Sequence, residues 1–362
     1  MSARPVDHDQ QPVVAAPGSP VTMRTVLGEP LSAGGYDLVL AHEHLLIDIS
    51  CWLDTEHPVH RRLRDLPVGP DSIDLVRSHP FASPDNVVLA DPEVAIEELT
   101  IDPADHQLGD HDPPGRMLVV DVTPDTAGAD PPRLAEISRR SGVDIVRGCG
   151  PYIERSWDGR VDPDAVTADI VAAFDDRYPA AVIGEIGTSA PTTAGESRVL
   201  RGAAQAQAEL QAPLYVHVDP WAPDSRRALD VIEQHGGDLT RTVICHQDIV
   251  AVRDPAAVRA VLDRGALVAI DIWGDEDGYG GDPMPTDDER LSAVLGLIED
   301  GWGQRLLHSQ DVCTKSQLRR FGGPGYLHLW TRIRPRLERI GLTVDLINDQ
   351  LAGNALRLLS GV

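Results

Sequence analysis

The chain has 362 residues, 42% of them hydrophobic, and a formal net charge of −25 at pH 7. This length fits one large α/β barrel or two ordinary domains. The acidic balance argues against nucleic acid and anionic membrane surfaces as partners, because both attract basic patches. No apolar run in the sequence approaches the roughly 20 residues needed to cross a bilayer. We therefore expect a globular protein with material for a sizeable core and with neither nucleic acid nor a membrane as partner.

The first residues and the cysteines bear on domain boundaries and on the compartment. Residues 1–20 are polar and rich in proline and alanine, without the basic start and apolar stretch of a signal peptide. This composition predicts a disordered tail ahead of a single barrel domain at 21–362. The four cysteines are scattered and form no Cys-x-x-Cys pair, so we expect reduced thiols in a cytoplasmic protein. A homodimer is expected only because homodimers are common.

From residue 21 onward, short apolar runs with strand character alternate with segments of helix length. A long insertion, residues 51–115, follows the first run and contains one convincing helix at 92–99, with Asp91 as N-cap and proline in the first turn. Further helices are expected at about 132–141, 164–176, 194–210, 225–235, 255–264 and 286–300, and more at the C-terminal end. The eight expected strands are 36–41, 117–122, 143–148, 181–186, 213–218, 241–246, 266–270 and 305–309.

Eight successive strand–helix units predict an α/β fold of the (β/α)₈ TIM-barrel type, with a helical insertion after the first strand. The strands are largely apolar, as strands buried on both faces of a parallel sheet are. An open, doubly wound sheet is the alternative. Such a sheet usually carries a glycine-rich nucleotide loop after its first strand, and here that place holds His42-Glu43-His44. The barrel is therefore favoured.

Residue types that bind metals recur at the carboxyl ends of these strands, where a barrel gathers its active site. His42 and His44 end the first strand and point to the same side, while Glu43 between them would face away. The fourth, fifth, sixth and eighth strands end with Glu185, His217, His246 and Asp311. The intervals of 32, 29 and 65 residues are close to one, one and two structural repeats. Any one of these residues could be an ordinary buried polar group, but six at equivalent positions predict a metal centre.

Six protein ligands exceed the three or four of a single catalytic ion and suit two ions about 3.5–4 Å apart. Zinc is the default for histidine and carboxylate ligands, with Mn²⁺, Co²⁺ and Fe²⁺ as alternatives. Their order around the barrel divides the six. A deeper ion would be held by His42, His44 and Asp311, and a second ion by His217 and His246. Glu185 would bridge the two ions.

Several stretches resemble the phosphotriesterase family of the amidohydrolase superfamily, and the resemblance extends from residue 23 to residue 354. They are HEHLLID (42–48), VIGEIGTS (182–189), VH (216–217), CH (245–246), SQDVCTK (309–315) and FGGPGY (321–326). The resemblance implies a binuclear hydrolase with the six ligands in the roles above. In the phosphotriesterases proper a carboxylated lysine bridges the metals. This chain has Glu185 there and a single lysine, Lys315, so it resembles the branch of phosphotriesterase-related and homology proteins.

The expected mechanism follows from two metal ions in a barrel mouth. A metal-bound hydroxide would attack a carbonyl or phosphoryl centre, with Asp311 as both metal ligand and proton acceptor. The expected substrate is a small carboxylic ester, lactone or N-acyl amide. A phosphotriester or phosphodiester hydrolase is the first alternative, and a catalytically silent metal-binding barrel is the alternative of a different class. Fold analogy does not decide among these activities.

Three residues are candidate substrate contacts. Tyr152 follows the third strand, where related lactonases carry a tyrosine over the metal pair, although a packing role is an equal alternative. Asp271 ends the seventh strand and would face the barrel mouth if the register holds. Lys315 could pair with an anionic group of the substrate or with a surface carboxylate. Two loops, 274–285 and 319–328, are long enough to cover the site.

Overall fold

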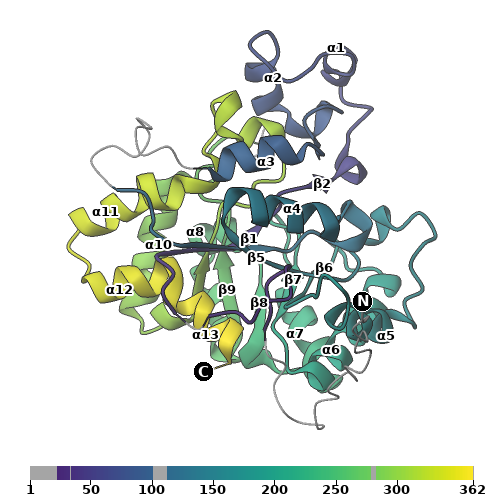
Figure 1. Cartoon of the computed structure of the whole chain (residues 1–362), viewed down its shortest axis with the longest axis vertical. Coiled ribbons are helices and arrows are strands. Elements are labelled where there is room, and N and C mark those ends of the chain that lie inside the picture. The colour runs from purple at the N-terminus through teal and green to yellow at the C-terminus, as the bar shows by residue number, and fades with distance from the viewer. Residues whose placement is uncertain (1–22, 33, 101–111, 279–282, 362) are drawn as a thin grey trace, which may run out of the picture.

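The computed structural model describes residues 23–32, 34–100, 112–278 and 283–361 (Figure 1). The predicted tail, residues 1–20, lies outside the described residues. No helix in these ranges is long and apolar enough to span a membrane.

Eight parallel strands form the centre of the described fold, and each begins and ends within two residues of its predicted place. They pair in chain order, three in one group and five in the other. Almost every residue in them is buried, because both faces are covered. The two groups are β1 (Leu38–Glu43), β4 (Met117–Asp121) and β5 (Asp144–Arg147), then β6 (Ile183–Gly187), β7 (Leu214–His217), β8 (Thr242–Ile244), β9 (Leu267–Ile270) and β10 (Leu306–His308).

The two groups of strands are joined on both sides. Beyond β5, the amide of Gly184 donates to the carbonyl of Cys149 at 2.7 Å, which links β5 to β6. Between β10 and β1, the side chain of Glu43 accepts hydrogen bonds from the backbone amides of Gln310 at 2.7 Å and Val312 at 2.9 Å. Glu43 therefore faces away from the barrel mouth and ties β1 to the loop after β10. The predicted (β/α)₈ barrel is confirmed.

Helices cover the outside of the strands (Figure 1). Local sequence explains where they begin: Thr193 and Glu196 form a capping box at the start of α6, and Thr286 and Glu289 form one at the start of α10. The predicted helices between strands are present as α4 (Pro131–Ser141), α5 (Val166–Phe174), α6 (Ala194–Leu210), α7 (Ser225–Gln234), α9 (Pro255–Asp263) and α10 (Asp287–Glu299), with the short α8 (Asp248–Arg253) after β8 and α11 (Arg334–Arg339), α12 (Val344–Asn348) and α13 (Asn354–Ser360) at the end.

The insertion after β1 forms a helical layer beside the barrel mouth (Figure 1). The predicted helix is present as α3 (Pro92–Leu99), and the Asp91 side chain accepts a hydrogen bond from the amide of Glu93. An antiparallel pair of short strands, β2 (Ile47–Asp48) and β3 (Val88–Leu89), closes the base of the insertion. Two short helices that the sequence analysis did not predict complete it, α1 (His60–Leu63) and α2 (Ile73–Ser78), and they pack around a small apolar cluster of their own.

Candidate metal centre

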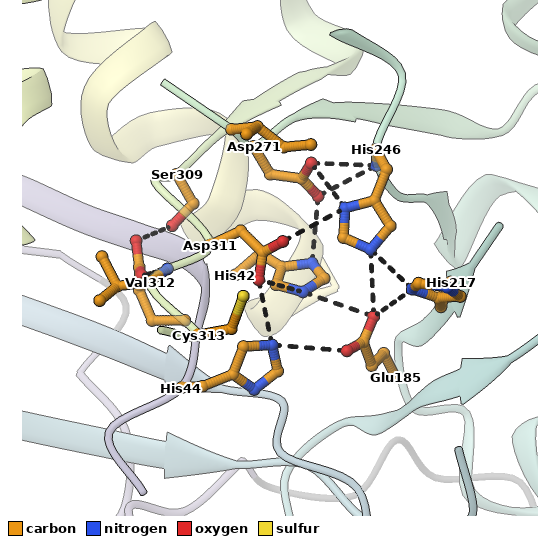
Figure 2. A network of polar contacts seen from close by, with 12 residues as sticks. His42, His44, Glu185, His217, His246, Asp271, Ser309, Asp311, Val312 and Cys313 are labelled. Carbon is orange, nitrogen blue, oxygen red and sulfur yellow. Dashed lines mark hydrogen bonds and ion pairs between the residues drawn. The ribbon is translucent and has the colours of Figure 1, made fainter. Parts of the chain in front are cut away.

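The two histidines at the end of β1 point into the barrel mouth, and both are buried (Figure 2). His44 Nδ1 lies 3.1 Å from the hydroxyl of Thr123, which turns its Nε2 toward the centre. There, His44 Nε2 lies 3.4 Å from Glu185 Oε1 and 3.2 Å from Asp311 Oδ1. His42 Nε2 has no hydrogen-bond partner among the described residues. A buried ring nitrogen without a hydrogen bond, beside carboxylates, fits a metal ligand.

Glu185 in β6 lies between the two histidine sets. Its Oε1 faces His44, while its Oε2 lies 3.3 Å from His217 Nδ1 and 3.3 Å from His246 Nε2. The same Oε2 lies 3.5 Å from His42 Nε2. The Glu185 carboxylate therefore contacts histidines of both sets, as a ligand that bridges two ions must.

Asp311 and His246 share an unusual backbone conformation just beyond the ends of β10 and β8. Their φ angles are 48° and 57°, in the left-handed region that residues other than glycine rarely adopt. Such a conformation costs about 1–3 kcal/mol and is concentrated at functional sites. Asp311 Oδ1 approaches the β1 histidines, and its Oδ2 lies 3.7 Å from His246 Nδ1. Asp311 is also the most exposed of the six side chains, at 15%.

The structure thus brings the six predicted ligands to one place. Potential ligand atoms lie within 4.8 Å of one another in three groups that cover all six residues. Glu185 belongs to two of the groups, on opposite sides of the centre. The groups are His42, His44 and Glu185; Glu185, His217 and His246; and His42, His246 and Asp311.

The centre is rich in carboxylate charge, which shifts the pKa values of ionisable side chains within it. Burial lowers the pKa of His44, but the hydrogen bonds that Asp311 and Glu185 accept from its ring, together with their charge, outweigh burial and raise the pKa to about 9. Burial raises the pKa of Glu185, and the charge of His42 and the histidine contacts bring it well below its usual value. The donor set therefore fits divalent ions.

Asp271 does not lie where the sequence analysis placed it. The side chain has no exposed surface, and it accepts a hydrogen bond from the backbone amide of His246 at 3.0 Å. Its two oxygens lie 3.1 Å from His42 Nδ1 and 3.1 Å from His246 Nδ1 (Figure 2). Through these Nδ1 contacts Asp271 is positioned to orient His42, from the ligands of the deeper ion, and His246, from the ligands of the second ion. Carboxylates commonly orient metal-binding imidazoles in this way. Sequence shows that Asp271 ends a strand but not which side of the histidines it faces.

Tyr152 lies over the centre, near the predicted place. Its hydroxyl lies 3.4 Å from His217 Nδ1 and accepts a hydrogen bond from the indole of Trp52 at 3.1 Å. Burial and the charge of Glu185 raise the pKa of Tyr152 well above its usual value, so its hydroxyl keeps its proton. Sequence analysis missed Trp52, because the insertion carries no periodic pattern that would show which of its residues reach the mouth.

The mouth above the centre is a small cavity of about 70 Å³. Its floor is lined by five of the predicted ligands, His44, Glu185, His217, His246 and Asp311. Its walls are mostly apolar and come from the insertion and from the loops after β7 and β9, chiefly Ile47, Ile49, Trp52, Phe81, Trp221 and Met284. No lysine or arginine lines it among the described residues.

Lys315 does not line this cavity. Its ammonium group instead pairs with the Asp85 carboxylate of the insertion at 2.5 Å. Of the two predicted covering loops, residues 279–282 of the first lie outside the described residues, and Met284 from the same loop lines the cavity. The second loop packs beside β1, where the Tyr326 hydroxyl donates to the carbonyl of His44 at 2.8 Å.

The sequence matches the Phosphotriesterase family model over residues 22–359. The chain belongs to the phosphotriesterase family. Among curated relatives, the N-acetyltaurine hydrolase of Bos taurus is 28% identical over 352 residues, covering 93% of this chain and 97% of that protein. The N-acetyltaurine hydrolase of Homo sapiens is 27% identical over 353 residues, with the same coverage of both chains.

Solved structures of the family share the barrel. A resiniferatoxin-binding protein from Rhodobacter sphaeroides superposes with a TM-score of 0.85 and is 34% identical, covering 94% of this chain and 95% of that one. A lactonase from Listeria monocytogenes superposes with a TM-score of 0.71 at 20% identity, covering 94% and 99% of the two chains, and this likeness concerns the fold alone. Because the family's enzymes are binuclear metal-dependent hydrolases, this protein is a metal-dependent hydrolase with candidate metal ligands at the barrel mouth.

Proposed function

We propose that this enzyme hydrolyses small, uncharged carboxylic esters, lactones or N-acyl amides, with two divalent ions held by the six predicted residues. The observation that carries the substrate class is the apolar mouth over the buried His42–Asp311 centre. An apolar wall favours an uncharged substrate, because a charged group there would lose its hydration without a partner. Zinc is the expected metal, with Mn²⁺, Co²⁺ and Fe²⁺ as alternatives.

The bound ions would lower the pKa of water to about 7 and polarise the substrate carbonyl. The protein residues then have separate tasks. Glu185 would hold the two ligand sets in register, because its carboxylate contacts histidines of both sets. Asp311, the most exposed ligand, would accept the proton of the attacking water and deliver it to the departing oxygen or nitrogen.

Tyr152 would donate a hydrogen bond at the rim of the same centre. Its hydroxyl is protonated, lies beside His217, and is held in place by the Trp52 indole. The donor would face a substrate oxygen once the mouth is filled. Tyr152 thereby marks the boundary between the polar floor and the apolar walls.

Hydrolysis of an anionic amide is a second candidate, favoured by the names of the curated relatives. N-acetyltaurine carries a sulfonate, which needs a cation or several hydrogen-bond donors near the scissile bond. The described lining of the cavity provides no lysine or arginine for this purpose. We therefore rank uncharged substrates first.

A substrate panel on the metal-loaded enzyme separates these activities. Two amides with the same acetyl group isolate the effect of charge: N-acetyltaurine and uncharged N-acetylpropylamine. A set of apolar lactones and an aryl phosphotriester complete the panel. We expect the highest kcat/KM for an uncharged carboxyl compound. A higher kcat/KM for N-acetyltaurine or for the phosphotriester would contradict the proposed substrate class.

Compartment and assembly belong to the same proposal. The four cysteines are all free, which agrees with the reducing compartment expected from the sequence. We propose a cytoplasmic enzyme, and a homodimer as its assembly.

A further inference from the structure

A second cavity lies at the opposite end of the barrel from the metal centre. It has a volume of about 330 Å³ and is lined by residues at the beginnings of β8, β9 and β10 and in the helix α13. Three arginines line it: Arg241 just before β8, Arg305 just before β10 and Arg357 in α13. Among the described residues, no aspartate or glutamate lines it. In a chain with a net charge of −25, this local excess of positive charge is unusual.

The guanidinium group of Arg241 is only partly satisfied, although the charge of Asp238 acts on it. It is half-buried, forms no ion pair with a described residue, and its Nε is buried without a hydrogen-bond partner among the described residues. A buried guanidinium N–H without an acceptor costs free energy, and acceptors from a bound anion would remove that cost.

The other two arginines are held in place by their neighbours. Arg357 pairs with the Asp349 carboxylate at 2.8 Å and also donates to the side-chain oxygen of Asn354. Arg305 donates to the backbone carbonyl of Gly265. Among the described residues, Arg357 is therefore the one arginine of the three that forms an ion pair, and Arg357 and Arg305 are already oriented before any ligand enters.

We propose that this cavity binds a phosphate oxyanion, either as free phosphate or as a small phosphate monoester. The guanidinium fork matches tetrahedral phosphate, with two parallel N–H donors facing two oxygens. Burial lowers the pKa of Arg241, and a phosphate would offset that desolvation by supplying opposite charge. The volume exceeds what one phosphate requires, so a monoester also fits. This site does not depend on the substrate proposed for the metal centre.

Isothermal titration calorimetry of the metal-loaded full-length enzyme tests the proposal, with inorganic phosphate in one arm and glycerol phosphate in the other. Because phosphate can also bind metal ions, inhibition of hydrolysis is measured in parallel. We expect one binding event that does not inhibit hydrolysis. The ligand with the lower Kd in this event, inorganic phosphate or glycerol phosphate, is the one that the cavity prefers. Detection of only an event that inhibits hydrolysis competitively would overturn the proposal.

Two variants locate the event. Arg241→Met removes the arginine whose Nε has no hydrogen-bond partner among the described residues, and Gln304→Glu places a carboxylate at an exposed position of the cavity lining. Each should weaken the non-inhibitory event at least about tenfold and leave kcat/KM unchanged. Arg61→Met, which removes an equal charge from an exposed position on α1, should leave the event intact. If folded Gln304→Glu keeps its affinity for phosphate, or if Arg61→Met weakens it equally, the event depends on the overall charge of the protein and not on this cavity. Either result would overturn the proposal.

Discussion

The floor and the walls of the catalytic mouth are built in different ways. The floor consists of histidines and carboxylates at the ends of barrel strands, and each is fixed by several contacts with its neighbours. The walls come from the insertion after β1 and from loops, through apolar residues such as Trp52, Phe81 and Met284. The comparison indicates that the barrel sets the reaction, while the insertion and loops set which molecule reaches it. Variants of the floor should therefore change turnover or metal content, and variants of the walls should change substrate preference.

The largest effect is expected at the floor from Asp311→Asn. The amide can still contact a metal ion but cannot accept a proton at neutral pH. We expect at least one ion to remain bound, and kcat to fall by about 10²–10⁴-fold, the range typical of a lost proton-transfer group. Steady-state kinetics with metal analysis of the same sample checks this. A turnover near that of the wild type would remove Asp311 from proton transfer.

Asp271→Asn tests whether this carboxylate orients the histidines of the floor for metal binding. Because Asp271 contacts His42 and His246, its loss should loosen one histidine from each ligand set. We expect metal affinity to fall by about 10–100-fold, as is usual for partners of metal-binding histidines. Competition with a chelator measures it, with Asp277→Asn, an exposed aspartate of the next loop, as the matched control. If instead KM alone rises while metal affinity is unchanged, Asp271 acts on substrate.

The walls can be tested with Met284→Arg, which adds a cation to the apolar lining. We expect the ratio of kcat/KM for N-acetyltaurine over N-acetylpropylamine to rise by about tenfold, equivalent to about 1.4 kcal/mol. Metal content should not change. Met284→Leu, which keeps the apolar volume, is the control and should leave the ratio unaltered. A loss of metal from the arginine variant, without a shift in preference, would show that floor and walls are not separable.

The contrast between the floor and the walls also explains which features could be predicted from the sequence. All eight strands were found near their predicted places, because each is a buried apolar run bounded by turns or helices. The six residues at strand ends were found together because equivalent ends of successive strands meet around one axis. Asp271 was placed at the mouth on the same reasoning, which did not suffice, and for Lys315 the sequence left open a substrate group or a surface carboxylate as its partner. Asp271 lies behind the histidines, and Lys315 pairs with Asp85, a residue 230 positions away in the insertion.

The walls were not predictable for a related reason. Their residues come from the insertion and from loops, where neither a period of two nor one of 3.6 marks the side that faces inward. Trp52 and Phe81 reach the mouth only because the insertion folds back across it, stabilised by the pairing of β2 with β3. Long-range packing of this kind leaves no local signature in the sequence.

The central claim is that two ions at one centre, bridged by Glu185, are responsible for hydrolysis. Mass-spectrometric metal analysis of wild type and Glu185→Gln, titrated in parallel with a chelator while hydrolysis is followed, tests it most directly. We predict two ions per wild-type chain, joint weakening of both ions in the variant, and activity that declines with metal occupancy in each protein. Hydrolysis that continues after both ions are removed, or a variant that loses only one ion, would contradict this account.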